Sequence, residues 1–290
     1  MREAPAYTWL VSSVPVTPAR RPSFVVRPAS GWRLPNAREL WPYRDLLLVL
    51  AWRDLKLRYS QAVIGVAWVV LQPLLGATIL VLIFGRFVGG SGDRPYVLIV
   101  FAGFVFWLFF SGAVQRASSS IVLDAKLITK VYFPRVIIPL ASIVAALIDL
   151  LIGLAVVAVL MAYHGVVPGW QLAALPLLVV LGVAMAMGVG LWLAALNVKY
   201  RDFMYAAPFL LQVWLYASPV VYESEAIPDR WRTLYALNPV AGWIDSCRWA
   251  LLGTSVDTVA VVLSIGITAV VLFSGVLFFH GTERSMADVI

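Results

Sequence analysis

Six long apolar stretches restrict the fold of this 290-residue chain more than any other feature of its sequence. A helix needs about 20 mostly apolar residues to cross the hydrocarbon core of a bilayer. Six stretches reach that length without a lysine, arginine or glutamate, namely 62–85, 96–115, 137–161, 173–196, 203–222 and 258–279. The sequence therefore predicts an all-α membrane protein with six transmembrane helices.

The composition supports this class and excludes several others. Hydrophobic residues make up 62% of the chain and charged residues 13%, whereas soluble domains are about a quarter charged. A soluble protein of this size could not bury so much apolar surface. We therefore exclude an ordinary cytosolic enzyme, a disordered chain and a small disulfide-linked secreted domain.

The rare residue types exclude several kinds of site. Two histidines and a single cysteine cannot form a structural zinc site or an internal disulfide. None of the four lysines follows a glycine, so the chain has no G-x-x-x-x-G-K-[ST] phosphate loop. We therefore expect no metal and no cofactor in this chain, and no ATP bound through such a loop.

The basic residues predict the orientation. If the N-terminus is cytoplasmic, the cytoplasmic segments contain 17 of the 22 lysines and arginines, and the outer segments contain 5. Cytoplasmic loops are enriched in lysine and arginine, so both termini are expected in the cytoplasm. This bias also explains the net charge of +7 without a nucleic-acid partner.

The region before the first stretch divides into two parts. Residues 1–36 contain six prolines and one acid, which is typical of a disordered cytoplasmic tail. Residues 37–60 have a short apolar centre between charged flanks, which predicts an interfacial helix at the cytoplasmic face that could act as a gate. Residues 61–290 then form the six-span transmembrane domain.

The segment 223–257, between the fifth and sixth stretches, is neither a plain loop nor a span. Its apolar residues are interrupted at Asn238 and Pro239, and proline breaks a helix. Two short helices in a re-entrant hairpin would fit, because irregular backbone enters a membrane only where protein or a water-filled cavity covers it. This hairpin is a candidate exit gate. The alternative is a pair of amphipathic helices on the outer leaflet.

Aromatic side chains within the stretches are candidates for lining a path for sugars. Aromatic faces stack on the C–H faces of sugars, although aromatics also pack against lipid and other helices. The candidates are Trp68, Phe104, Trp107, Phe110, Trp214 and Tyr216.

Asp149 is the one acidic residue inside the six stretches. An acid inside a membrane is a functional candidate by default. We expect no other ionisable group at its depth, which argues against a proton relay. The preferred interpretation is a protonated or hydrogen-bonded acid that faces a neighbouring helix.

The cytoplasmic connection after the second stretch has the pattern L-I-x-K-x-Y-F-P-R-x-x-x-P over residues 127–139. Its basic ends and apolar face are typical of a short helix that binds in a groove of another protein. The pattern resembles the coupling loop of the type-2 ABC exporter permeases that move polysaccharides. This resemblance implies docking on a separate ATPase subunit through Leu127, Ile128, Lys130, Tyr132, Phe133, Pro134 and Arg135.

Other short pieces are similar to the same family, and the resemblance covers about residues 40–290. It implies three further groups of site residues: an entrance or gate at Arg58, Tyr59, Gln72 and Pro73; a second cytoplasmic loop at Tyr200, Arg201 and Asp202; and an outer hairpin at Asn238 and Pro239. Glu283 in the C-terminal tail also matches. Arg58 and Tyr59 could meet the anionic pyrophosphate of a substrate at the entrance.

The resemblance implies the transmembrane subunit of an ATP-driven exporter that moves a lipid-linked polysaccharide, of the O-antigen, teichoic acid or galactan type, across the bacterial cytoplasmic (inner) membrane. The implied partners are two ATPase subunits, which bind ATP and Mg, a second copy of the chain, the lipid-linked glycan and membrane lipids. The chain itself would not be an enzyme.

Other functions remain open. An ABC permease for a drug or a small lipid is the main alternative, because related permeases serve such substrates. An ion-coupled secondary transporter would need several intramembrane ionisable groups and fits less well. A membrane-embedded glycan enzyme would need paired carboxylates or a metal cluster, and only the outer acids Glu223, Glu225 and Asp229 lie close in sequence.

Overall fold

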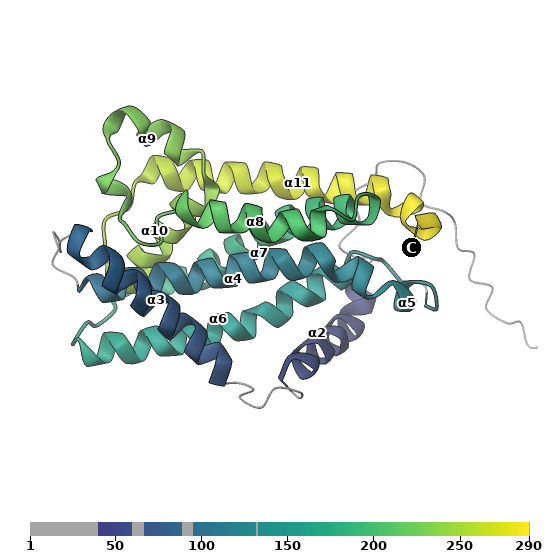
Figure 1. Cartoon of the computed structure of the whole chain (residues 1–290), viewed down its shortest axis with the longest axis horizontal. Helices are drawn as coiled ribbons and strands as arrows, with labels where there is room; N and C mark the ends of the chain where they lie inside the picture. The colour runs from purple at the N-terminus through teal and green to yellow at the C-terminus, as the bar shows by residue number, and fades with distance from the viewer. Residues whose placement is uncertain (1–39, 60–66, 89–94, 132, 290) are drawn as a thin grey trace, which may run out of the picture. The chain divides into compact units, whose positions relative to one another are not determined.

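The computed structural model describes residues 40–59, 67–88, 95–131 and 133–289. These residues form helices and turns, with no strand among them, as the apolar stretches predict (Figure 1). The predicted disordered tail, 1–36, lies outside the described residues. Tyr132 of the predicted coupling loop also lies outside them.

The helices keep their order along the chain. They are α2 (Arg44–Tyr59), α3 (Ala67–Val88), α4 (Tyr96–Leu123), α5 (Ala125–Ile128), α6 (Ile137–Tyr163), α7 (Leu175–Lys199), α8 (Phe203–Tyr216), α9 (Asp229–Ala236), α10 (Pro239–Leu252) and α11 (Thr258–Val289). Three short 3-10 turns accompany them: η1 (Trp41–Tyr43), η2 (Trp170–Ala174) and η3 (Ser224–Ala226).

Five of the six predicted spans correspond to long apolar helices, which are α3, α4, α6, α7 and α11. The prediction for 203–222 was too long as a single helix. Within it, α8 has 14 residues, which is about 21 Å against a hydrocarbon core of about 30 Å. The chain turns after Tyr216, where Pro219 lacks the N–H that a continuing helix needs. The described residues thus contain five helices long enough to span.

Helix α4 is the centre of the bundle. In its most apolar stretch 78% of residues are buried, against 11% in α3. It packs against α6 and α7, with α3, α8 and α10 also in contact, while α11 lies along α7. Phe106 and Phe110 of α4 contact the ring of Trp243 from α10. Gly182 of α7 leaves the space that this ring fills.

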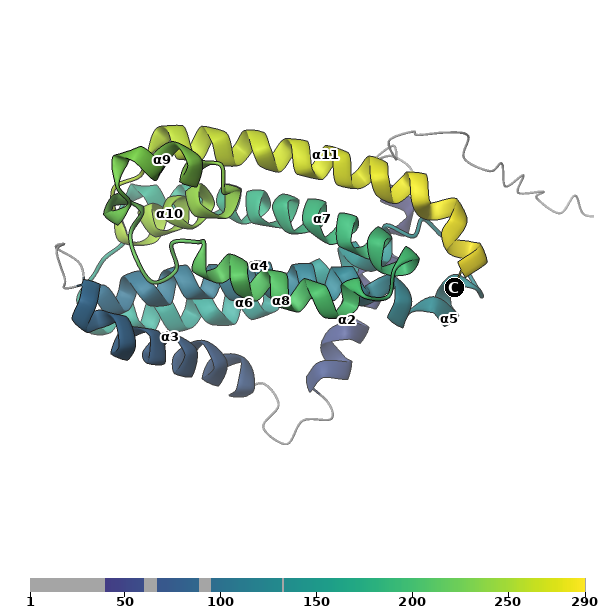
Figure 2. The ribbon, with the colours of Figure 1, turned by 45° about the horizontal axis from the view of Figure 1, so that its top comes forward.

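Short helices of the described chain lie at both ends of the bundle. Helices α9 and α10 lie at one end, and α5 with the C-terminal end of α11 lies at the other, in both views (Figure 1 and Figure 2). Helix α2 packs against α6.

Candidate functional site

The segment Asp124–Arg135, here called the docking segment, links α4 to α6. It begins with the single turn α5 and continues through further turns. The side chains of Lys126, Lys130 and Val131 are exposed. Helix α5 lies at the end of the bundle (Figure 2). The exposure of the three side chains makes them accessible to a partner protein.

Phe133 corrects one prediction about this segment. The sequence placed its ring on the face that docks on a partner, but the side chain is only 6% exposed and belongs to the chain's own core. It packs in a cluster with Leu50 of α2, Ile121 of α4 and Val136. Phe133 therefore holds the docking segment on the bundle, and Leu127 and Ile128 are half-buried against the same cluster.

Both ends of the docking segment are tied to other helices. The Asp124 backbone N–H donates to Ser120 O at 3.0 Å, and its carbonyl accepts from Leu127 N–H at 2.9 Å. Its side chain accepts a 2.6 Å hydrogen bond from Arg53 Nη2 of α2. At the other end, Arg135 Nη1 donates to the Glu283 carbonyl of α11. The two matches to the family, in the loop and in the tail, are thus in direct contact.

Arg53 joins three elements. Its Nη2 also donates to Asp54 Oδ1 at 2.9 Å, and Ser142 Oγ of α6 donates to Asp54 Oδ2 at 3.1 Å. Burial acts to lower the pKa of Arg53, but its hydrogen bonds to Asp124 and Asp54 raise the pKa above its ordinary value. This cluster, here called the Arg53 cluster (Arg53, Asp54, Asp124), has one cation and two anions.

A second cluster lies about one turn further along α2, and in it the positively charged side chains outnumber the negatively charged ones. Arg58 donates to Asp149 Oδ2 of α6, and Tyr59 Oη donates to Asp149 Oδ1 at 2.6 Å. Arg116 Nη2 of α4 lies 3.4 Å from Asp149 Oδ2. We call Arg58, Tyr59, Arg116 and Asp149 the positive cluster.

The positive cluster corrects the expectation that Asp149 has no ionisable group at its depth. Two guanidinium groups reach it, from α2 and from α4. The preferred interpretation, a hydrogen-bonded acid facing a neighbouring helix, agrees with the structure. Because Leu50 and Ala51 on α2 are also buried, this helix is fixed to the bundle by both apolar and ionic contacts.

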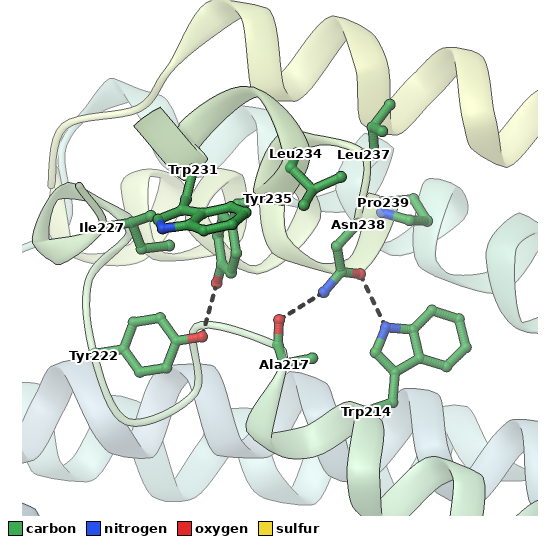
Figure 3. Close-up of a pocket in the computed structure, with 10 residues that line it drawn as sticks. All are labelled: Trp214, Ala217, Tyr222, Ile227, Trp231, Leu234, Tyr235, Leu237, Asn238 and Pro239. Atoms are coloured by element: carbon green, nitrogen blue, oxygen red, sulfur yellow. Dashed lines mark hydrogen bonds between the residues drawn. The ribbon is translucent and has the colours of Figure 1, made fainter. Parts of the chain in front are cut away.

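The opposite end of the bundle has an open groove of about 620 Å³ (Figure 3). We call it the outer groove. It is lined by the end of α8, the following loop, α9 and the start of α10, through Trp214, Ala217, Tyr222, Ile227, Trp231, Leu234, Tyr235, Leu237, Asn238 and Pro239. Most of this lining is aromatic or aliphatic.

Asn238 holds the outer groove together. It caps α10 by accepting from Val240 N–H at 3.1 Å, and its Oδ1 also accepts from Trp214 Nε1 at 2.9 Å. Its Nδ2 donates to Ala217 O at 2.9 Å and to Ser218 Oγ at 3.1 Å. The predicted break at Asn238 and Pro239 is confirmed as the junction of α9 and α10.

Two tyrosines complete the polar part of this groove. Tyr235 Oη donates to Tyr222 Oη at 3.3 Å, and Figure 3 shows this pair on the opposite side of the groove from Trp214. Burial, with the hydrogen bond to Tyr222, raises the pKa of Tyr235, so the Tyr235 hydroxyl stays neutral near pH 7.

Arg248 was missed by the sequence reasoning, which counted it among the outer loop charges. Its guanidinium is buried and donates to the carbonyls of Ile99, Tyr222 and Val220 at 3.0, 3.1 and 2.8 Å. Burial lowers the pKa of Arg248. It ties α10 to the start of α4 and to the loop that borders the outer groove. An acid three residues earlier, Asp245, was the available signal.

The candidate aromatics differ in exposure, and Trp214 is half-buried. Phe104, Trp107 and Phe110 are buried in the chain's own core, where Phe110 lies edge-on to Trp214 at 5.4 Å between centroids. Trp68 and Tyr216 are exposed. A role for these residues in lining a path stays a prediction.

The remaining predicted residues lie at helix ends or within helices. Tyr200, Arg201 and Asp202 are exposed between α7 and α8. Gln72 is exposed and Pro73 buried inside α3. The described residues contain no group of three histidine, cysteine or acidic side chains that could hold a metal ion.

A family model for the ABC-2 type transporter matches residues 45–252. The chain belongs to the ABC-2 type transporter family. The matched region begins in α2 and ends with α10, so it includes the docking segment, both ionic clusters and the outer groove. Members of the ABC-2 family are transport permeases that work with an ATPase subunit. The resemblance found in the sequence is therefore confirmed, and the chain is a multi-pass membrane protein.

Curated relatives are similar over most of this chain. The O-antigen export system permease protein RfbA of Myxococcus xanthus is 32% identical over 211 residues, covering 72% of this chain and 81% of the relative. A protein of the same name from Klebsiella pneumoniae is 29% identical, over 70% and 79% respectively. The polysialic acid transport protein KpsM of Escherichia coli is 23% identical, over 81% and 92%.

Proposed function

We propose that this chain is the transmembrane subunit of an ATP-driven exporter of a lipid-linked polysaccharide, of the O-antigen, teichoic acid or galactan type. The observation that carries the proposal is the similarity to polysaccharide permeases. The relatives from three organisms are named for O-antigen or polysialic acid. Two copies of the chain would form one conduit in the bacterial cytoplasmic membrane and bind two ATPase subunits.

In this proposal the docking segment and both termini face the cytoplasm. The excess of basic residues on that side supports the orientation. Helix α8 with residues 217–222 completes a sixth crossing, and α9 with α10 forms a re-entrant hairpin at the outer face. The position of α9 and α10 at the end opposite α5 supports this placement (Figure 1).

The contacts at the docking segment suggest how ATP energy reaches the spans. ATP and Mg, bound by the partner subunit, supply the energy when that subunit closes. Its movement would displace Lys130 and the rest of the docking segment. Asp124 would carry the displacement to α2 through Arg53, and Arg135 would carry it to α11 through Glu283.

The outer groove is the proposed exit for the glycan. Its rings from Trp214, Tyr222, Trp231 and Tyr235 can stack on sugar C–H faces. The amide of Asn238 is already occupied by hydrogen bonds within the chain. A surface of this kind binds many sugars weakly, which suits a polymer that must slide.

The experiment is to express the chain together with a candidate ATPase subunit, purify the complex, and measure ATP hydrolysis with defined lipid-linked glycans. We expect a stable complex whose ATPase activity rises with the glycan. Failure to form any complex would contradict the proposal. Stimulation by a drug or a small lipid, with no response to the glycan, would favour the alternative substrate class.

A further inference from the structure

The outer groove is lined by uncharged side chains. None of the described residues in its lining is acidic or basic, and its largest members are the rings of Trp214, Tyr222, Trp231 and Tyr235 (Figure 3). The faces of such rings pack on the C–H faces of sugars. A carboxylate or phosphate that enters the groove would lose water and gain no counter-charge from the lining, which is costly.

Three polar hydrogens of the groove are already engaged within the chain. Trp214 Nε1 donates to Asn238 Oδ1 at 2.9 Å. Tyr235 Oη donates to Tyr222 Oη at 3.3 Å, and Tyr222 Oη donates to Tyr216 O at 3.4 Å. An ionised carboxylate or phosphodiester accepts hydrogen bonds but does not donate them, so it would compete with these contacts. A sugar hydroxyl also donates, so it can bond to the tyrosine oxygens as they stand.

The charges next to the outer groove are mainly acidic. A neighbouring cavity of about 250 Å³ shares Tyr235 with it. The charged residues that line this cavity are Glu223, Glu225, Asp245 and Asp257, with Arg232 and Arg248. The guanidinium of Arg248 is buried and donates to three backbone carbonyls, so it does not face a ligand. Like charges oppose binding, and a polyanion in the groove would lie beside this surplus of carboxylates.

Arg230 is a basic residue in contact with the lining. Its guanidinium lies 5.8 Å from the centroid of the Trp231 ring, and Asp229 precedes it at the start of α9. One arginine beside one acid adds no net charge. A polymer with an anion on every sugar needs a counter-charge for each sugar that the groove holds, and this pair does not supply it.

We propose that the outer groove selects an uncharged glycan and disfavours one whose repeats carry carboxylate or phosphate groups. The inference rests on the proposed function and narrows its substrate class. Of the types that the resemblance implies, a galactan has neutral sugars, whereas a teichoic acid has a phosphodiester in each repeat. The groove therefore suits a galactan or an O-antigen with neutral repeats.

The test uses the full chain in nanodiscs of phosphatidylcholine, which add no sugar headgroup and no net charge. Three ligands are titrated by saturation-transfer NMR: a galactose hexamer, a galacturonic acid hexamer and the methyl ester of that acid. The acid and its ester share their sugars and linkages and differ in charge. We expect the two neutral hexamers to bind and the acid to bind about tenfold more weakly. The affinity for the acid should rise with salt, which screens repulsion, while the affinity for the ester should not.

Equal or tighter binding of the acid overturns the proposal. Absence of binding by both neutral hexamers also overturns it, and would leave the groove to lipid or to the second copy of the chain. Nanodiscs without protein establish the background signal.

A cation added to the lining should change the preference. Leu234→Lys places one at a lining residue that is 60% exposed. It should raise the affinity for the acid about tenfold and leave that for the ester nearly unchanged, which a structural defect would not do. Val167→Lys is the matched control, because Val167 is exposed just before η2, which contacts α10, and is not a lining residue. An unchanged preference in Leu234→Lys overturns the proposal. If this variant does not fold, the salt dependence of the wild type decides.

A second pair of variants tests whether the sugars bind in this groove. Trp231→Ala removes one ring and should weaken binding of both neutral hexamers about fivefold. Trp170→Ala is the control, because its ring is exposed and contacts Trp249, outside the lining. Unchanged binding by Trp231→Ala would place the sugars elsewhere and overturn the proposal.

Failure of this inference differs from failure of the proposed function. Export of a lipid-linked polyanion by the permease–ATPase complex would overturn the charge preference and leave polysaccharide export. Binding of the neutral hexamers with the expected preference, but without export of any glycan, would remove the proposed function and leave the preference.

Discussion

Arg53 Nη2 of helix α2 lies 2.6 Å from Asp124 Oδ2, at the residue where span α4 ends and the docking segment begins. The backbone of Asp124 is hydrogen-bonded both to α4 and to the docking segment. The side-chain contact with Arg53 therefore fixes α2 to the junction between these two elements. This arrangement gives any force on the docking segment a direct path to α2. From α2 the path continues to α6 through Asp54 and Ser142.

Replacing Asp124 with asparagine removes the charge of this contact but keeps the shape of the side chain. We expect the complex with the ATPase to form normally, while ATP-dependent export falls fivefold or more, as about 1 kcal/mol of coupling implies. Export and co-purification are measured on the same preparation. Asp45→Asn is the control. Among the described residues, the ion pair of Asp45 is with Arg44, and both side chains are exposed. Equal export by both variants would exclude the Arg53 contact from coupling.

Lys130 tests the exposed part of the docking segment. Lys130→Glu reverses an exposed charge and should reduce association with the ATPase about tenfold, because reversing a rim charge opposes the partner's complementary potential. Membrane insertion should be normal. Arg230→Glu makes the same charge change on α9, at the opposite end of the bundle (Figure 1), and should leave association unchanged. A normal affinity for Lys130→Glu would place the ATPase elsewhere.

Phe133 should behave differently from Lys130, because its ring is buried in the chain's own core. Phe133→Ala should lower the free energy of unfolding by about 3–5 kcal/mol, seen as a lower Tm of the chain without its partner. Leu123→Ala is the comparison, because Leu123 is exposed next to the same segment, and its Tm should change little. If Phe133→Ala has the Tm of the wild type, Phe133 does not stabilise the chain's own core, and the prediction that its ring contacts the partner is favoured again.

Asn238 is expected to hold the outer hairpin closed. Asn238→Ala removes the N-cap of α10 and the hydrogen bonds with Trp214, Ala217 and Ser218. The loss should be about 1–3 kcal/mol of local stability. Hydrogen exchange should accelerate in α9 and at the start of α10 but not in α6.

Asn238→Asp separates the two roles of this side chain. It keeps an acceptor for the cap and for Trp214 but loses the donors to Ala217 and Ser218, so its exchange rates should be intermediate. If both variants exchange at the wild-type rate, Asn238 does not stabilise the hairpin.

Long-range contacts limited what could be predicted from the sequence. Hydropathy located five long helices, because crossing a bilayer requires about 20 apolar residues in succession. It did not locate the end of α8, because residues 217–222 are about as apolar as the helix before them. Pro219 was the local signal for this end, and the hydropathy pattern does not register it. The break at Asn238 and Pro239 was predictable because proline acts on its own helix.

The contacts of the candidate site depend on residues far apart in the chain. Arg58 and Asp149 are 91 positions apart, and no local pattern pairs them. The apolar face of the docking segment was visible, but a pattern cannot say whether a partner or the chain itself covers Phe133. In the structure, Phe133 packs in the chain's own core. Arg248 was counted as a loop charge for the same reason, because its three carbonyl acceptors come from other segments.

The most direct test of the account is transport in vesicles that contain the purified permease–ATPase complex in a single orientation. A lipid-linked glycan is added on the ATPase side, and its accessibility to a lectin on the opposite side is followed over time. The account predicts that the glycan becomes accessible with ATP and Mg, but not with a non-hydrolysable ATP analogue or with vesicles that lack the permease. Glycan that stays on the ATPase side during sustained ATP hydrolysis would contradict export of a lipid-linked polysaccharide by this chain.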